Sequence, residues 1–460
     1  MSIAIEIGKL VDGHRVNRRV YTDQDVFEAE MDRIFGHTWV FLCHESELAE
    51  AGEFRTMTIG TQPVIVTRDD NGSVQVLMNS CAHRGATLCQ QTRGRANNFR
   101  CWYHGWTYNH RGELVGVPYA EAYGPDFDRG RRGLLKATRV QIYRGLVFAS
   151  LAAAGDDLID HLAGARRYID AFIDLSPLGQ IEARAGGHSF TYPGNWKFQM
   201  ENGVDGYHPN FVHRSFWENQ PEGAMDIFTA TSPCVTRALG NGHGILDMSA
   251  LVSHPATNGK ANRSADAKPA TQLPSDGLKP AVDGAYFDQL VKAWGYERAV
   301  EVTANANVNL LIFPNLLIIG VQLRTISPIS VMETQVYQQP TTLKGVPEQM
   351  NLARLRSHEA FYGPGSLGAP DDVEMFIRCS LGMRVRGREW IEFDRGLHRE
   401  RIEHGETVAQ ITDELTQRAF YRRWRELMAR DNPYRDTTAI RDASADAVRS
   451  KSRGSSPRSE

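Results

Sequence analysis

The side chains best suited to chemistry are concentrated between Asn195 and His213. Four groups able to bind a metal lie there within 13 residues: Glu201, Asp205, His208 and His213. In a helix, Asp205 and His208 would share one face because they are three residues apart. Pro209 should bend or end that helix and leave His213 on a redirected segment, since on a straight helix it would lie about 140° around from His208. Two imidazoles held in this way suit a divalent metal; the alternative is a partly buried helix with two structural histidines.

Two shorter clusters lie upstream, and each pairs one cysteine with one histidine. They are Cys81-Ala82-His83 and Cys101-Trp102-Tyr103-His104. Zinc could bind the two pairs, but zinc sites usually group the two cysteines together and the two histidines together. A mixed pair in each half suits a two-iron, two-sulfide cluster in which the cysteines bind one iron and the histidines the other. The imidazoles would then raise the reduction potential relative to a cluster with four thiolates.

The segments that must position these groups predict two architectures. From Trp39 to about Leu151 the apolar residues form short β-like runs, with hairpin turns at 69–72 and 109–112, and Asn71-Gly72 should supply positive φ angles in the first. We therefore expect a small all-β domain that carries both cysteine–histidine loops. The run 308–337 is rich in Ile, Leu and Val and is interrupted at 314–315, 320 and 328. It predicts consecutive strands in a larger α+β domain.

Helices are predicted on both sides of the β region. Thr22 should cap a helix that ends near Gly36, residues 156–175 have helical spacing before Pro177, and 420–428 line one face of a late helix. The segment 255–284 lacks periodicity and is expected to be a long loop, and 431–460 a disordered polar tail. Cys43, Cys234 and Cys379 have no cysteine partner nearby in the sequence, so we expect them to be small buried side chains.

Composition narrows the function classes. The 460-residue chain has a net charge of −3, with 41% hydrophobic and 23% charged residues, which is ordinary for a globular protein. This net charge does not indicate a positively charged surface that would bind nucleic acid or an anionic membrane. No apolar run approaches 18 residues and the first residues do not form a secretory signal, so we expect a cytoplasmic protein.

Together the motifs resemble the α (large) subunit of Rieske non-haem iron aromatic-ring-hydroxylating oxygenases. Cys81-x-His83 with Cys101-x-x-His104-Gly105-Trp106 is similar to the Rieske motif, and the run 195–213 is similar to the mononuclear-iron segment that follows it. The resemblance extends from about residue 23 to 428. It implies an α+β fold with four parts. Residues 1–38 would form an N-terminal helical segment packed on the catalytic domain, and residues 39–155 a Rieske [2Fe–2S] domain. Residues 156–430 would form a mononuclear-iron catalytic domain of the helix-grip type, in which helices wrap an antiparallel sheet, and residues 431–460 a tail.

The resemblance also implies roles for individual residues. The cluster ligands would be Cys81, His83, Cys101 and His104. The mononuclear Fe(II) would bind His208, His213 and a downstream aspartate, for which Asp372 is our choice and Asp371 the alternative. Asp205 would link His208 to His104 of a neighbouring subunit and so provide an electron path. Asn202 is expected to line the pocket, whereas Glu201 is expected to be structural and Tyr207 to pack.

The implied reaction is hydroxylation of an aromatic ring with O₂, as a cis-dihydroxylation or a monohydroxylation. Because no dinucleotide-binding motif follows a strand, electrons should come from an NADH-dependent flavin reductase, directly or through a ferredoxin. The expected assembly is an α₃ trimer or α₃β₃ with a small β subunit. The sequence looks most like the branch acting on benzoate, salicylate, anthranilate or cumate, and Arg324, Arg384 and Arg386 are candidates to bind a carboxylate. The alternatives are a naphthalene- or biphenyl-type hydrocarbon dioxygenase and a Rieske electron-transfer protein without oxygenase activity.

Overall fold

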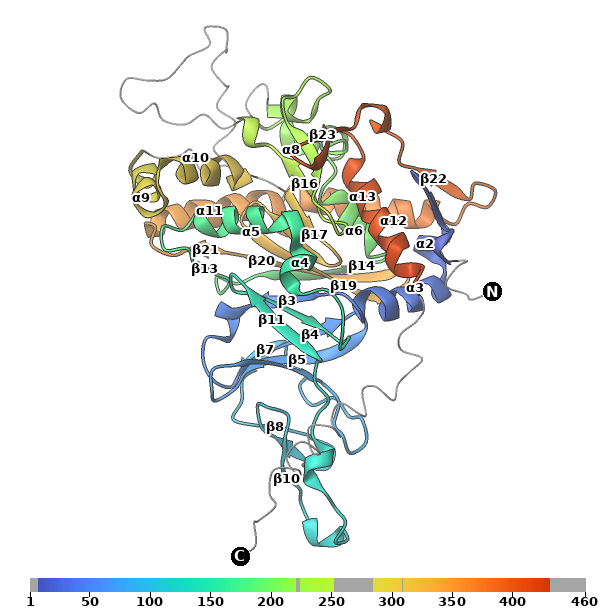
Figure 1. The fold of residues 1–460 in the computed structure, drawn as a ribbon, viewed down its shortest axis with the longest axis vertical. Coiled ribbons are helices and arrows are strands. Elements are labelled where there is room, and N and C mark those ends of the chain that lie inside the picture. The colour runs from blue at the N-terminus through green and yellow to red at the C-terminus, as the bar shows by residue number, and fades with distance from the viewer. Residues whose placement is uncertain (1–6, 221–223, 252–283, 308, 431–460) are drawn as a thin grey trace, which may run out of the picture.

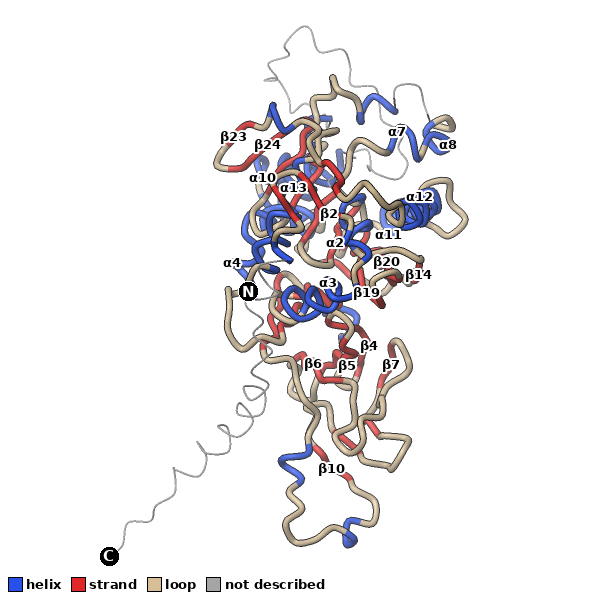
Figure 2. The backbone as a smooth tube through the Cα atoms, turned by 90° about the vertical axis from the view of Figure 1, so that its right-hand side faces the viewer, coloured by secondary structure: helices blue, strands red, loops and turns tan. Residues whose placement is uncertain are grey.

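The structure, a computed structural model, describes residues 7–220, 224–251, 284–307 and 309–430. Figure 1 shows a small β-rich lobe below a larger lobe in which helices cover a wide sheet. Figure 2, turned by 90°, shows the small lobe narrowing toward β10. The predicted α+β class, with a small all-β domain beside a larger antiparallel sheet wrapped by helices, is confirmed. The predicted tail 431–460 and the predicted loop 255–284, apart from Gly284, lie outside the described residues.

The small lobe is built from three antiparallel sheets. The first sheet has the strand order β6, β5, β4 and β7 (Val74–Met78, Gln62–Arg68, Glu53–Ile59, Arg93–Arg95). The second has the order β10, β9 and β8 (Leu114–Gly116, Thr107–Tyr108, Phe99–Arg100). The third has the order β11, β12 and β3 (Arg139–Tyr143, Leu146–Ser150, Val40–His44). Phe54, Ile65 and Phe99 pack at the centre of this lobe with Cys81 and Cys101. The two cysteine–histidine loops are therefore anchored in a hydrophobic core.

Both predicted hairpins of this lobe are present. β5 pairs with β6 and β9 with β10, and Gly72 and Gly112 have φ of 84° and 77°. The prediction of a positive φ at Asn71 is wrong. Its backbone N–H donates to the Asp69 carboxylate at 2.9 Å, so a side chain shapes the turn in place of a second left-handed residue.

A nine-stranded antiparallel sheet forms the centre of the large lobe in the described part of the chain. Its spatial order is β14 (His188–Tyr192), β20 (Glu333–Pro340), β19 (Gln322–Ser330), β18 (Leu316–Ile319), β17 (Asn309–Ile312), β16 (Gly244–Asp247), β15 (Val235–Ala238), β24 (Glu406–Gln410) and β23 (Arg401–Glu403). The consecutive strands predicted in 308–337 are confirmed. Pro328, however, lies within β19 opposite Thr334 and only shifts the register before Ser330.

Helices cover both faces of this sheet because residues along each strand alternate between two cores. Leu311 and Leu317 pack with α6 (Lys197–Asn202), α12 (Ala369–Gly382) and α13 (Leu415–Met428). Leu310 and Ile318 pack on the opposite face with α4, α5, α9 and α10 (Leu158–Leu162, Arg166–Asp174, Gly284–Trp294, Tyr296–Ala304). The other elements used below are α2 (Arg19–Thr22), α3 (Gln24–Glu30), α7 (Pro209–Val212), α8 (Arg214–Trp217) and α11 (Glu348–Tyr362).

Several local predictions need correction. Asp23, not Thr22, caps α3, because its carboxylate accepts from the N–H groups of the first turn, whereas Thr22 belongs to α2. The helix predicted at 156–175 is divided into α4 and α5 at Ala163, which has φ of 44°. Cys43 and Cys234 are buried as predicted, but Cys379 is exposed on α12.

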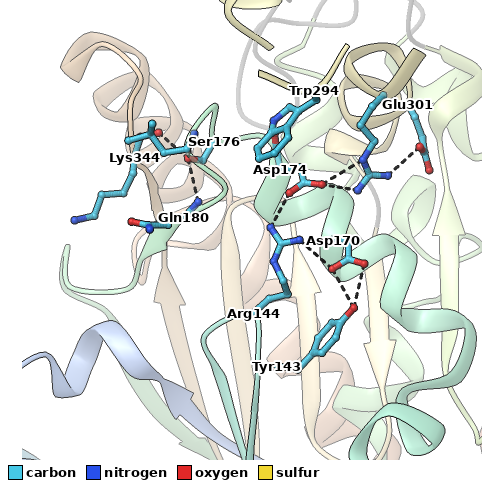
Figure 3. A network of polar contacts seen from close by, with 11 residues as sticks. Tyr143, Arg144, Asp170, Asp174, Ser176, Gln180, Trp294, Glu301 and Lys344 are labelled. Carbon is cyan, nitrogen blue, oxygen red and sulfur yellow. Dashed lines mark hydrogen bonds and ion pairs between the residues drawn. The ribbon is translucent and has the colours of Figure 1, made fainter. Parts of the chain in front are cut away.

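A polar network joins the two lobes at the turn between β11 and β12 (Figure 3). Tyr143 OH donates to the Asp170 carboxylate at 3.0 Å, and Arg144 bridges Asp170 and Asp174 of α5 at 3.2 and 2.6 Å. Arg298 of α10 reaches Asp174 at 2.6 Å from the other side. Because Asp174 is nearly buried between two arginines, this hairpin is held at a defined position on the large lobe.

Candidate metal centres and adjoining pocket

Cys81 and Cys101 begin two loops of the same geometry. The N–H of Gly85 donates to the Cys81 carbonyl at 2.8 Å, and the N–H of Gly105 donates to the Cys101 carbonyl at 2.9 Å. These glycines have φ of 74° and 71°, a conformation that side chains with a Cβ rarely adopt. Both glycines therefore lie in tight loops, and these loops bring the two cysteine–histidine pairs close together.

The groups carried by these loops fit a cluster with two sulfur and two nitrogen ligands. Cys81 and Cys101 are buried in the same core as Trp106. His83 stacks on Trp106, and its ring centroid lies 4.5 Å from that of His104. Nδ1 of His83 is buried without a hydrogen-bond partner, as expected of a nitrogen that serves as a metal ligand.

Tyr108 is a neighbour of this centre that the sequence did not reveal. Its hydroxyl lies 3.2 Å from Sγ of Cys81 and accepts a hydrogen bond from the N–H of Ala82, also at 3.2 Å. Burial raises the pKa of Tyr108, so the phenol keeps its proton and can donate it to the sulfur. A donor of this kind stabilises negative charge on a cysteine ligand and so tunes a cluster's potential.

His208, His213 and Asp372 converge on one point in the large lobe. Nε2 of His213 and Nε2 of His208 lie 3.2 and 3.5 Å from Oδ1 of Asp372, and one ligand atom of each residue lies within 4.8 Å of the others. Two imidazoles and one carboxylate form the donor set that holds a mononuclear iron from one side. The residues present therefore fit such an ion. Asp371, the alternative, is half-buried and lies outside this group.

The chain reaches this point through a turn and not through one bent helix, so the prediction that Asp205 and His208 share a helix face is wrong. α6 ends at Asn202, and both residues lie in the irregular segment after it. The Asp205 carboxylate accepts from the N–H groups of Tyr207 and His208 at 2.5 and 3.4 Å, which favours a turn over a helix. Pro209 is the first residue of α7, where its missing N–H leaves no hydrogen bond unmade.

The charges around the three residues favour ionised carboxylates, the form that can bind a metal. Burial disfavours ionised Asp372, but its hydrogen bond with His213 and the charges of both histidines outweigh that effect and hold its pKa below the usual range. Burial also disfavours ionised Asp205, but the hydrogen bond and charge of His208 outweigh burial and lower the pKa of Asp205. Nδ1 of His208 lies 3.7 Å from Oδ2 of Asp205. Both carboxylates therefore remain ionised at neutral pH.

Asn202 links the two sides of the site. Its amide nitrogen donates to Oδ1 of Asp372 at 3.1 Å and lies 3.2 Å from Nε2 of His208. It also lines the pocket, as predicted from the resemblance. Tyr207, predicted to pack, is partly exposed and lies under the Arg395 guanidinium at 3.9 Å from its ring centroid.

Behind the site, a buried glutamate anchors the first turn of α6. Glu30 of α3 accepts hydrogen bonds from Lys197 Nζ at 2.6 Å and from the indoles of Trp196 and Trp424 at 2.9 and 2.6 Å. The Lys197 and Glu30 side chains are fully buried, so each charge depends on the other. The N-terminal segment and α13 are thereby fastened to the helix that leads into residues 203–208. We call this segment the metal-bearing turn because it carries the candidate ligand His208.

A second glutamate, which is half-buried, anchors the other end of α6. Glu201, predicted to be structural, accepts hydrogen bonds from Tyr21 at 2.8 Å and from Tyr421. Burial is the main reason that the pKa of Glu201 is raised to about 7. The two tyrosines were not found from the sequence because they come from α2 and α13, at opposite ends of the chain.

A pocket opens on the three converging residues. Its apolar lining includes Leu246, Met248, Ile319 and Phe361. Arg324 also lines it and is 2% exposed, whereas Arg384 and Arg386, the other arginines considered for a carboxylate, lie exposed beyond α12. The pocket is therefore mostly apolar in surface, and it also contains the three converging residues and one buried cation.

No helix in the described ranges combines the length and the apolar character needed to cross a bilayer.

Comparison with known proteins assigns both lobes. Residues 38–142 match the Rieske [2Fe-2S] domain, and residues 174–430 match the ring hydroxylating alpha subunit (catalytic domain). The large subunit of anthranilate 1,2-dioxygenase from Acinetobacter baylyi is 34% identical over 84% of this chain and 81% of its own, and that of 2-halobenzoate 1,2-dioxygenase from Burkholderia cepacia is 32% identical over 86% and 83%. Naphthalene 1,2-dioxygenase with indole bound shares the fold, with a TM-score of 0.79, 24% identity and coverage of 95% and 96%. The chain thus belongs to the α subunits of the Rieske ring-hydroxylating oxygenases, which carry a [2Fe–2S] cluster and a mononuclear iron and use O₂.

Proposed function

We propose that this α subunit is the terminal oxygenase of a multicomponent system that hydroxylates an aromatic carboxylate. The observation that carries the proposal is the convergence of His208, His213 and Asp372 in a pocket that also contains Arg324. The bound iron would supply oxygen activation beside the substrate. A chain that only carried electrons would gain nothing from three converging ligands that leave one side open.

Each residue near the iron has a separate task in this proposal. His208, His213 and Asp372 hold the metal from one side. Asn202 donates to the Asp372 oxygen that faces both histidines, and so fixes the orientation of the carboxylate. The apolar lining excludes water from the ring, and Arg324 in the same pocket orients the ring through its carboxylate.

Electron supply requires the small lobe and a second subunit. Cys81, His83, Cys101 and His104 are proposed to hold the cluster. Asp205, next to His208, is proposed to accept a hydrogen bond from His104 of a neighbouring copy, which requires a head-to-tail trimer. Trp102 and Tyr103, which precede this histidine, are 91% and 61% exposed and so available for such a contact. Subunits of this family work with electron-transfer partners and often with a β subunit; here we propose α₃ or α₃β₃, served by a flavin reductase or a ferredoxin.

The proposed domain limits are 1–38 for the N-terminal segment, 39–155 for the Rieske domain and 156–430 for the catalytic domain. The family matches at 38–142 and 174–430 lie close to these limits. The proposed substrate class is supported by the names of the anthranilate and 2-halobenzoate relatives and by the buried arginine in the pocket. A hydrocarbon substrate is the second candidate, favoured by the apolar side chains that form much of the lining.

The test is a single turnover of chemically reduced protein with O₂ and a panel of benzoate, salicylate, anthranilate, cumate, naphthalene and biphenyl. Products are identified by mass spectrometry, and iron and sulfide are counted in the same samples. Hydroxylated acids with about three irons per chain support the proposal. Diols formed only from naphthalene or biphenyl would favour the second candidate, and about two irons per chain with no product would indicate an electron carrier.

A further inference from the structure

A row of paired residues crosses the sheet from the metal-bearing turn toward the sheet edge. Leu317 pairs with Arg324, Arg324 with Gln338, and Gln338 with His188. Directly paired residues of antiparallel strands project from the same face, with Cβ atoms about 5 Å apart. Leu317 packs against Gly203 just before Asp205, so Arg324 and Gln338 lie one and two strands away from that turn.

Helix α11 covers this row. His358 and Tyr362, one turn apart, have ring centroids separated by 5.5 Å. The Arg324 guanidinium lies 5.1 Å from the Tyr362 ring centroid, and the His358 ring stacks with that of His188 at 6.3 Å. We call this group of buried polar side chains, Arg324 and Gln338 from the sheet with His358 and Tyr362 from α11, the polar compartment. Arg324 and Tyr362 also line the metal-containing pocket, so the compartment adjoins it.

The compartment contains an unusual number of buried polar atoms without a partner. They are Nε and Nη2 of Arg324, both amide atoms of Gln338, and Nε2 of His358, whereas Nδ1 of His358 lies 3.6 Å from Oε1 of Glu359. These three residues are each at most 2% exposed. Burying a polar atom without a hydrogen bond costs free energy, and a buried cation without a counter-ion costs more. Within the described residues, Arg324 has no ion pair within 4.0 Å, and the charge of the Asp372 carboxylate acts on it only from farther away.

The orientation of Arg324 is specific. Its Nη1 donates to Oε1 of Gln199 at 3.3 Å, which fixes one branch of the guanidinium. The two nitrogens left without a partner, Nε and Nη2, form one edge of the planar group and point their N–H bonds in parallel. That edge matches the two oxygens of a carboxylate. Gln338, the cross-strand neighbour, offers a further N–H beside it.

We infer that the polar compartment binds the carboxylate of the aromatic substrate, with Arg324 as the specificity-determining residue and Gln338 as the second donor. The inference rests on the proposed function, because it concerns the same pocket and the same reaction. Bidentate binding at Arg324 would leave the ring in the adjoining pocket, which Arg324 lines together with His208, His213 and Asp372. His188, which bonds to the Glu359 carboxylate at 2.9 Å, closes the far end of the row. Arg384 and Arg386 take no part.

The test compares acids with their neutral amides in the metal-loaded oxygenase. Dissociation constants for benzoate, salicylate and anthranilate, and for benzamide, salicylamide and anthranilamide, are measured anaerobically by calorimetry in wild type, Arg324→Gln and the matched surface control Arg384→Gln. In Arg324→Gln the acids should bind about 100-fold more weakly, whereas the amides should change by less than about threefold. Arg384→Gln should bind both sets as wild type does. Unchanged binding of the acids to Arg324→Gln, or an equal loss for acids and amides, would overturn the inference.

Two further variants keep the test decisive if Arg324→Gln folds poorly, which iron and sulfide content would reveal. Arg324→Lys keeps the charge but loses the paired donors, so acid binding should weaken about tenfold. Gln338→Met keeps the arginine and the side-chain volume, and should weaken acid binding about fivefold with no effect on the amides. Wild-type affinity for acids in both variants contradicts the inference. Failure of the proposed function looks different: the wild-type protein would then bind and hydroxylate naphthalene or biphenyl but none of the acids.

Discussion

Replacing Glu201 with glutamine tests whether the helix leading to the metal site is held by a buried, proton-binding carboxyl group. The pKa of Glu201 is raised from 4.5 to about 7, mainly by burial. The folded protein therefore binds this proton more tightly than the unfolded chain. Below pH 4.5 Glu201 does not lower the free energy of unfolding. As the pH rises, Glu201 destabilises the folded state increasingly, until the effect levels off above the pKa of the folded state.

The size of the effect follows from the two pKa values. At pH 8 the folded state should be penalised by about 3 kcal/mol, and at pH 5 by about 1 kcal/mol. Glutamine carries no charge but keeps an oxygen that can accept from Tyr21 and Tyr421. The stability of Glu201→Gln relative to wild type should therefore increase by about 2 kcal/mol between pH 5 and pH 8. For a domain of this size that corresponds to a rise in relative Tm of about 4–8 °C.

Thermal unfolding followed by circular dichroism at several pH values would measure this difference at constant ionic strength. Titrations elsewhere in the protein affect both variants equally, so only the difference between the two curves is interpreted. Glu389→Gln, at an exposed position, is the matched control, and its Tm should depend on pH as that of wild type does. Parallel curves for Glu201→Gln and wild type from pH 5 to 8 would refute the assignment of a raised pKa to the buried group.

Three further outcomes are expected. Asp372→Ala should lower the iron content from about three to about two per chain with sulfide unchanged, whereas Asp371→Ala should retain all the iron, and equal losses would contradict the ligand choice. Asp205→Ala should keep both metal centres yet reduce turnover at least about 100-fold, with slow reoxidation of the reduced cluster in stopped-flow measurements, so full activity would exclude the proposed electron path. Tyr108→Phe should lower the cluster midpoint potential by roughly 40 mV, because a hydrogen bond of about 1 kcal/mol to Sγ of Cys81 stabilises the reduced state. An unchanged potential in a redox titration would show that Tyr108 does not tune the cluster.

The candidate metal ligands could be proposed from the sequence because ligand chemistry restricts residue types and spacing. Cys81 with His83, and His208 with His213, stand out for that reason, and the strands of the central sheet follow from runs of Ile, Leu and Val. The shape of the turn at Asp205 was not predictable from helical spacing, because the side chain competes with the helix for the backbone N–H groups.

Features that depend on long-range packing were also not predictable. Arg324 and Arg384 look equivalent in the sequence, but one lies in the middle of a covered sheet and the other in an exposed segment. Tyr21 and Tyr421 meet at Glu201 although they are 400 residues apart. Nothing in the local pattern of either tyrosine indicates that contact, because it is created by the packing of α2 and α13 on α6.

The pairing of β3 with β12 has a consequence for how this protein can be rebuilt. Val40 lies opposite Ala149 and His44 opposite Leu146, so the chain enters and leaves the small lobe at adjacent points. The lobe is therefore a cassette inserted between the N-terminal helices and α4. A cassette from another α subunit could be exchanged at these two strands, provided that it keeps the Arg144 contacts to Asp170 and Asp174. The redox centre could then be varied while every side chain that shapes the substrate pocket stays the same.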